Sequence, residues 1–203
     1  MPIGEVIFTQ RSIRRFKLDP IPLDDIRVIL EAAIKAPSGG NLQPARFVVL
    51  NNTEVIRQFG ELYREAWWAK RRDEGRSWTS REQVPPGDAP TTGAARLADE
   101  IKDAPCIILA LTNGNRIASS VIPSVQNLML AARALGIGSV PTTLHPQVME
   151  RVYALLGIPP EMELQMCIPL GYPLGRFGPT QRRPTAEVSY LNHWGSLVPW
   201  ATD

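Results

Sequence analysis

Three apolar runs constrain this chain most, because each is the length of a strand and carries few charged residues. They are RFVVLNN (46–52), CIILALTN (106–113) and ELQMCIPLGYP (163–173). A strand with one face in water alternates apolar and polar residues, whereas an unbroken apolar run needs cover on both faces. The three runs therefore predict one central sheet with helices packed on both sides of it.

Periodic segments between these runs predict the helices. In residues 23–36 apolar positions recur at helical spacing, Asp24 and Asp25 stand at the start, and Pro37 is expected to end the helix. Thr53 is the expected cap of the next helix. Residues 138–144 read as a short strand or a turn. The other predicted helices span residues 5–10, 53–72, 97–104, 117–138 and 147–157.

Two segments lack such periodicity. Residues 73–93 are rich in Gly, Pro, Ser and Thr and read as a long surface excursion, and the last 30 residues are proline-rich and extended. The tail, about 172–203, has no core of its own, which an obligate dimer with embracing tails would explain. We expect residues 1–203 to form a single domain, because the chain shows no internal repeat.

Composition excludes several classes of protein. A formal net charge of +2 on 203 residues gives no reason to expect nucleic acid or a membrane surface as partner. No run reaches the roughly 20 apolar residues that span a bilayer, and the first residues lack a secretory pattern. Cys106 and Cys167 each stand inside an apolar run and are expected as buried thiols. The expected location is the cytoplasm.

One polar segment, QRSIRRF (10–16), offers cationic donors. Arg11 and Arg14 are three residues apart and would lie on one side of a helical turn, and Ser12 adds a hydroxyl. Two guanidinium groups with a hydroxyl suit an oxyanion or an electron-rich ring edge. A solvated basic helix end is the alternative interpretation.

A second polar segment, APSGGNLQPARF (36–47), offers backbone access and amides. Gly39 and Gly40 let a ligand approach the main chain closely, while Ser38, Asn41 and Gln43 both donate and accept. Ordinary residues of a helix-to-strand turn are the alternative. Two further segments, GSVPTTLHP (138–146) and TQRRP (180–184), are weaker signals of the same kind.

Motifs of other chemistries are missing from the sequence. The chain has no GxGxxG, GxxxxGK[ST] or GxSxG, and neither of its histidines, His145 and His193, has a partner at metal-ligand spacing. We therefore expect no bound metal. A chain with ligand-gripping loops but few acid–base residues suits a cofactor that brings its own reactivity.

Taken together, the segments resemble the FMN-dependent nitroreductase family. The resemblance runs in order through RSIRRF (11–16), LEAAIKAPSGGNLQPARFVVL (30–50), QNLMLAARALGIGS (126–139), LGYP (170–173) and RRPTAEV (182–188). It implies an α+β fold with a central, mainly antiparallel sheet. It also implies an intertwined homodimer, with two FMN molecules at the interface, each contacted by both subunits.

The resemblance also implies a set of flavin-binding positions. Gln10 stands where many members carry a further arginine, and Arg182 is the first choice for the phosphate-binding arginine, with Arg183 the second. The full set of expected cofactor-binding residues is Gln10, Arg11, Ser12, Arg14, Pro37, Ser38, Gly39, Asn41, Gln43, Pro141, Thr142, Thr143, Arg182 and Arg183. The segment from Pro141 to Thr143 is expected beside flavin N5.

The function implied is reduction of a nitroaromatic, a quinone or a similar small acceptor with NAD(P)H, by ping-pong hydride transfer. No catalytic side chain is expected, and Arg14 would tune the flavin electronically. Alternatives are dehalogenation, enone or azoline redox chemistry, flavin fragmentation, a deazaflavin cofactor, a flavin-binding protein without turnover, or an interaction domain without cofactor. Residues 60–95, with Trp67, Trp68 and Trp78, are either a lid over the flavin or aromatic packing.

Overall fold

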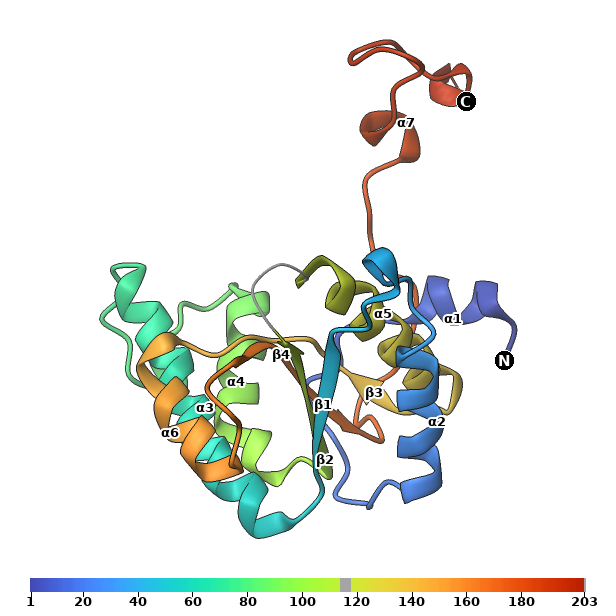
Figure 1. The fold of residues 1–203 in the computed structure, drawn as a ribbon. Helices are drawn as coiled ribbons and strands as arrows, with labels where there is room; N and C mark the ends of the chain where they lie inside the picture. Colours follow the sequence, from blue (N-terminus) through green and yellow to red (C-terminus); the bar gives the residue numbers. More distant parts are fainter. Residues whose placement is uncertain (114–117, 203) are drawn as a thin grey trace.

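The computed structural model describes residues 1–113 and 118–202 and shows an α+β fold (Figure 1). A four-stranded sheet has the order β1–β2–β4–β3, and each pair of neighbours is antiparallel. The strands are β1 (Ala45–Leu50), β2 (Cys106–Asn113), β3 (Gly138–Ser139) and β4 (Met162–Gly171). The fold class and the predicted antiparallel sheet are confirmed.

Helices cover both faces of the sheet, as the apolar runs predict. They are α1 (Ile3–Thr9), α2 (Leu23–Ala33), α3 (Thr53–Asp73), α4 (Ala89–Glu100), α5 (Ala118–Ala134), α6 (Pro146–Leu156) and α7 (Thr185–Val188). In Figure 1, α3, α4 and α6 lie on one side of the sheet, and α2 and α5 lie on the other. Short 3₁₀ turns are η1 (Gly39–Asn41), η2 (Arg81–Gln83), η3 (Ile101–Asp103) and η4 (Pro199–Thr202).

Strand β2 shows why the run had to be apolar throughout. Ile107 and Leu109 are fully buried in the core shared with α3, α4 and α6, whereas Cys106 and Ile108 are fully buried in the core shared with α2 and α5. Successive side chains of a strand point to opposite faces, so both faces must be apolar. Cys106 and Cys167 are buried thiols, as predicted. Their burial raises the pKa of each to about 12.

Helix boundaries differ from the sequence predictions at several ends. Asn52 caps α3 in place of Thr53, because its Oδ1 accepts from the amides of Glu54 and Val55 at 3.0 and 3.1 Å. Helix α2 ends at Ala33, ahead of the proline expected to stop it. The predicted start of α5 at Ile117 lies outside the described residues.

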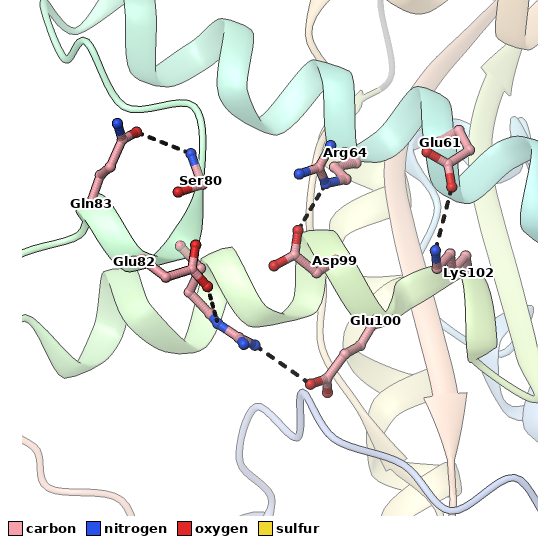
Figure 2. Close-up of polar contacts among 9 residues, drawn as sticks. Glu61, Arg64, Ser80, Glu82, Gln83, Asp99, Glu100 and Lys102 are labelled. Carbon is pink, nitrogen blue, oxygen red and sulfur yellow. Dashed lines mark hydrogen bonds and ion pairs between the residues drawn. The ribbon is translucent and has the colours of Figure 1, made fainter.

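Helix α4 begins at Ala89, not at residue 97, so the surface excursion shrinks to residues 74–88. Asp88 accounts for the early start, because its side chain accepts from the amide of Thr91 at 3.1 Å and Pro90 occupies the first turn. Around the excursion, exposed polar contacts connect α3, η2 and α4, among them Arg64 with Asp99 at 2.8 Å (Figure 2).

The tail leaves the body of the fold after Gly178. Its last main-chain contacts with the body are Leu174 N to the carbonyl of Arg15 at 3.1 Å and Gly178 N to the carbonyl of Thr9 at 3.2 Å. Beyond that point the chain extends away from the sheet and helices, and carries α7 and η4 at a distance from them (Figure 1). No helix in the described parts of the chain is long and apolar enough to cross a membrane.

Candidate functional site

The segment from Gln10 to Phe16 is held against the end of the sheet. Ser12 forms a parallel bridge with Ser139, and the amide of Ile13 donates to the Ser139 carbonyl at 3.0 Å. A β-carbon added at Gly138 would lie 2.7 Å from Cβ of Ile13, so the close approach requires a glycine there. The bridge brings Ser12 and Arg14 into the neighbourhood of the segment that follows β3.

Tyr63 and Thr142 meet at this place from distant parts of the chain. The Tyr63 hydroxyl lies 2.8 Å from Oγ1 of Thr142. Burial raises the pKa of Tyr63 to about 12, and the charge of Arg14 opposes that rise. The half-buried Arg14 therefore acts on the Tyr63 hydroxyl electrostatically.

Lys70 makes the corresponding contact with the next residue. Its Nζ donates to the Thr143 carbonyl at 2.5 Å and to Thr143 Oγ1 at 2.6 Å. Burial lowers the pKa of Lys70, and within residues 1–113 and 118–202 no carboxylate lies within ion-pair distance of it. An ammonium group without a counter-charge thus stands beside the Pro141–Thr143 segment.

The loop of residues 37–43 is closed by its own polar groups. The amide of Gln43 donates to Oγ of Ser38 at 2.8 Å, Nε2 of Gln43 donates to Oδ1 of Asn41 at 3.2 Å, and the amide of Gly39 donates to Oγ of Ser120 on α5 at 3.2 Å. Asn41 and Gln43 have φ of 54° and 48°. A left-handed glutamine is uncommon, and such strain concentrates at functional sites.

The remaining expected positions are exposed or make their contacts elsewhere in the single chain. Gln10 caps the end of α1, and its amide contacts the sulfur of Met129 at 3.8 Å. Pro37, Arg11 and Pro141 are exposed. Arg182 and Arg183 are exposed on the tail, where Arg182 donates to the carbonyl of Gln181 at 2.8 Å.

The expected site arginines differ from several other arginines of the chain in their ion pairing. Arg27, Arg64 and Arg151 each pair with a carboxylate at 2.9 Å or less. In the part of the chain that the structure describes, Arg11, Arg14, Arg182 and Arg183 have no such pair. Guanidinium groups without a protein counter-charge are available for a ligand with negative charge.

The structure brings the segment with Ser12 and Arg14 beside Ser139, just before the Pro141–Thr143 segment, whereas the 37–43 loop and Arg182 make their contacts elsewhere. No hydrogen bond between described residues connects the 37–43 loop or the tail arginines to the Arg14 segment or to the Pro141–Thr143 segment. A single chain thus divides the expected positions among three places: the segments around Arg14 and Thr142, the 37–43 loop beside α5, and the tail.

A comparison with family models relates this arrangement to known proteins. The model described as "Nitroreductase family" matches residues 7–172, which include the N-terminal motif, the 37–43 loop and the Pro141–Thr143 segment. The chain belongs to the nitroreductase family. The match ends where the extended tail begins.

Relatives of this nitroreductase-family chain carry more than one functional name. It is 30% identical over 184 residues to an iodotyrosine deiodinase of Thermotoga neapolitana, covering 88% of this chain and 91% of the relative. It is 33% identical over 196 residues to an NADH dehydrogenase of Thermus thermophilus, covering 88% and 90%. Among solved structures, a protein of Desulfovibrio desulfuricans described as a nitroreductase in complex with FMN superposes with a TM-score of 0.70 at 25% identity, covering 96% and 98%.

Sequence reasoning missed the contribution of α3 to the site. Tyr63 and Lys70 are seven residues apart, so they lie on one face of the helix, two turns from each other. The available signal was a hydroxyl and an ammonium group at that spacing on an amphipathic helix, a pattern that packing and surface residues also produce. Trp67 and Trp68 are 7% and 5% exposed and pack in the core on the α3 side, which supports the packing interpretation for these two residues.

Proposed function

We propose that this chain is an FMN-dependent oxidoreductase that reduces nitroaromatic, quinone or similar small acceptors with NAD(P)H. The observation that carries the proposal is the bridge between Ser12 and Ser139, which holds the Arg14 segment beside the strand that leads to Thr142, together with the absence of an ion pair at Arg14 among the described residues. Family membership and the FMN complex of the Desulfovibrio protein support the choice of cofactor.

The residues present fit FMN in their donor chemistry. A phosphorylated ring system needs cations for its phosphate and hydrogen-bonding groups for its ring edge. Arg11, Arg182 and Arg183 supply guanidinium groups that are exposed and lack carboxylate partners in the described chain. Asn41 and Gln43 supply amides on a loop whose backbone is held in a left-handed conformation.

Bound FMN would supply hydride transfer at N5, first accepting from NAD(P)H and then donating to the acceptor in a ping-pong sequence. The protein's part is to bind and orient. Arg14 would stabilise the negative charge that two-electron reduction places on the ring. At about 4 Å and an effective dielectric near 20, one such charge pair is worth about 4 kcal/mol.

The role of Arg14 has a direct test. In Arg14→Ala we expect a lower flavin reduction potential, since the stabilising cation is gone, and the shift is measured by equilibration with a reference dye. Arg15→Ala is a matched control, because Arg15 neighbours Arg14 in sequence and is exposed. A potential that is unchanged in Arg14→Ala and in the control would defeat this assignment.

We further propose a homodimer in which each FMN contacts both subunits. Two features support it. Strand β1 is at the edge of the sheet, and the tail leaves several large apolar side chains exposed. These are Val188, Leu191, Trp194, Leu197 and Trp200. A second copy that covers the tail would also bring Arg182 and the 37–43 loop toward a site in its partner.

We propose the cytoplasm as the location and one domain, residues 1–203, as the organisation. The two buried cysteines support a reducing compartment. Residues 74–88 remain the candidate for a lid over the site. They form the long connection between α3 and α4, which contains no α-helix.

A second candidate function is reductive dehalogenation of a halogenated arene. The observation that favours it is the 30% identity with the iodotyrosine deiodinase of Thermotoga neapolitana over most of both chains. Assays of reduced enzyme with a nitroarene, a quinone and an iodophenol separate the two functions. Turnover of the iodophenol alone would favour dehalogenation.

The visible spectrum of the purified protein, with the mass of the released chromophore, tests the proposed cofactor. We expect bands near those of oxidised flavin and the mass of FMN, and bleaching of the bands by NADH or NADPH. Release of a deazaflavin would correct the cofactor, and a flavin that neither nucleotide bleaches would indicate binding without turnover. Colourless protein that takes up no FMN would refute the proposal.

A further inference from the structure

Burial fixes the direction of the hydrogen bond between Tyr63 and Thr142. The Tyr63 side chain is 3% exposed, and a phenol has a single proton to donate. Within the described residues, Oγ1 of Thr142, at 2.8 Å, is the one hydrogen-bond partner of the Tyr63 hydroxyl. A buried donor left unpaired is costly, so Tyr63 donates and Thr142 accepts.

The proton of Thr142 is then left for another acceptor. The main chain of Thr142 is already engaged, because its amide donates to the Cys167 carbonyl at 2.9 Å and its carbonyl accepts from the Cys167 amide at 2.7 Å. Among residues 1–113 and 118–202, no acceptor other than the Tyr63 oxygen lies within hydrogen-bond distance of the Thr142 hydroxyl. Thr142 therefore presents one free donor, on a backbone that the sheet holds in place.

Lys70 fixes the direction of a hydrogen bond at Thr143 in the same way. An ammonium group donates and cannot accept, so the Thr143 hydroxyl, 2.6 Å from Nζ, is also an acceptor toward α3. One face of α3 thus supplies donors to two consecutive threonine hydroxyls. The contacts leave both hydroxyl protons directed to something outside this part of the chain.

We propose that Tyr63 is a positioning residue, which fixes the Thr142 hydroxyl as a hydrogen-bond donor to an acceptor atom of the FMN ring. The inference rests on the proposed function, because it needs FMN in this neighbourhood. Isoalloxazine nitrogen and carbonyl oxygen atoms are acceptors, so a donor of fixed direction suits them. Preorganised donors bind more tightly than donors that must be ordered on binding.

A double-mutant cycle on FMN binding tests the inference. The proteins are wild type, Tyr63→Phe, Thr142→Val and the double variant, each stripped of cofactor and titrated with FMN by flavin fluorescence. We expect Tyr63→Phe to weaken FMN binding about 3- to 10-fold, the size of one hydrogen bond. We expect no further loss when Tyr63→Phe is added to Thr142→Val, since Tyr63 acts through Thr142.

Tyr153→Phe is the matched control. The Tyr153 hydroxyl donates to the Met162 carbonyl at 2.8 Å and accepts from the Leu164 amide at 3.0 Å, away from the Pro141–Thr143 segment. Tyr153→Phe removes a phenol hydroxyl, as Tyr63→Phe does, but from a half-buried side chain outside the candidate site. We expect a lower melting temperature in this variant and an unchanged dissociation constant for FMN.

The outcomes separate this inference from the proposed function. Wild-type protein that takes up no FMN overturns both. Wild-type protein that binds FMN, with Tyr63→Phe binding equally well, overturns the inference alone. Losses that add in the double variant also overturn it, because Tyr63 would then act by packing and not through the Thr142 hydroxyl.

Discussion

The body of the chain and its tail bury their apolar side chains very differently. In the body, β2 is buried along nearly its whole length between two helical layers. In the tail beyond Gly178, Val198 is buried, yet Trp194 is 90% exposed and Leu197 is 72% exposed. A segment gains its ordering free energy from buried apolar area. The body therefore has its own source of stability, whereas the tail gains little from contacts within its own chain.

The same division separates the parts of the candidate site. The body holds Arg14, Thr142 and Thr143 in place through β3, β4 and α3. The tail carries Arg182 and Arg183 without any contact to that group in the described chain. If FMN contacts both the body and the tail, loss of the tail should weaken FMN binding strongly. The same loss should change the stability of the body only a little.

Removal of residues 179–203 gives the largest expected effect on this contrast. We expect a folded monomer that binds FMN more than about 100-fold more weakly, because the phosphate-binding cations and the apolar dimer contacts are lost together. Light scattering gives the mass and absorbance gives the FMN content. A truncated chain that remains dimeric with full FMN content would show that the body alone makes the site.

Alkaline pH tests the body. Burial raises the pKa of Cys106, Cys167 and Tyr63 to about 12 each, from ordinary values of 9.0, 9.0 and 10.0. The folded state keeps these protons while the unfolded state loses them. Their contribution is therefore complete below pH 9 and is lost as the pH rises toward 12. Each group adds a slope of about 1.4 kcal/mol per pH unit in its window.

Urea unfolding at a series of pH values with a reductant measures that slope. In Cys167→Ala we expect the free energy of unfolding to fall less steeply above pH 9, because one of the three titrating groups is gone. The tail truncation should retain the wild-type slope, since all three groups lie in the body. A Cys167→Ala slope equal to that of wild type would contradict the assignment.

Much of the body could be predicted from the sequence, because period and composition report burial locally. The run at residues 106–113 matches β2 in full, and the apolar segment before Gly136 forms α5. The predicted start of α4 at residue 97 was wrong, because its N-cap, Asp88, lies inside a Gly- and Pro-rich stretch whose composition is typical of a loop. Local composition there outweighed the capping signal.

The site was less predictable, because its contacts join residues far apart in sequence. Arg14 and Thr142 were expected from the resemblance, and the Ser12–Ser139 bridge holds their two segments side by side. Tyr63 and Lys70 were missed, since a tyrosine and a lysine on an amphipathic helix look like ordinary packing and surface residues. The roles of the expected positions toward FMN stay predictions.

Arg182→Ala gives an intermediate expected effect. A charge-assisted hydrogen bond is worth about 1.5–3 kcal/mol, so we expect FMN to bind about 10- to 100-fold more weakly, with the melting temperature of the cofactor-free protein unchanged. Isothermal titration with FMN provides the measurement. Arg183→Ala is the matched control and should lose less. The reverse order would assign the phosphate to Arg183.

Arg64→Ala gives the smallest expected effect. Arg64 pairs with Asp99 at 2.8 Å on the outer side of α3 and α4 (Figure 2), with side chains 44% and 29% exposed. Exposed pairs contribute about 1 kcal/mol or less. We expect a small loss of stability in thermal unfolding and unchanged FMN affinity, and a tenfold loss of affinity would place this surface in the site.

We propose that the body and the tail of two chains together enclose FMN. Native mass spectrometry of the purified protein, supplied with excess FMN and desalted, measures the oligomeric state and the FMN content at once. We expect one dominant species with two chains and two FMN molecules. A monomer without FMN, or a dimer that retains none, would contradict it.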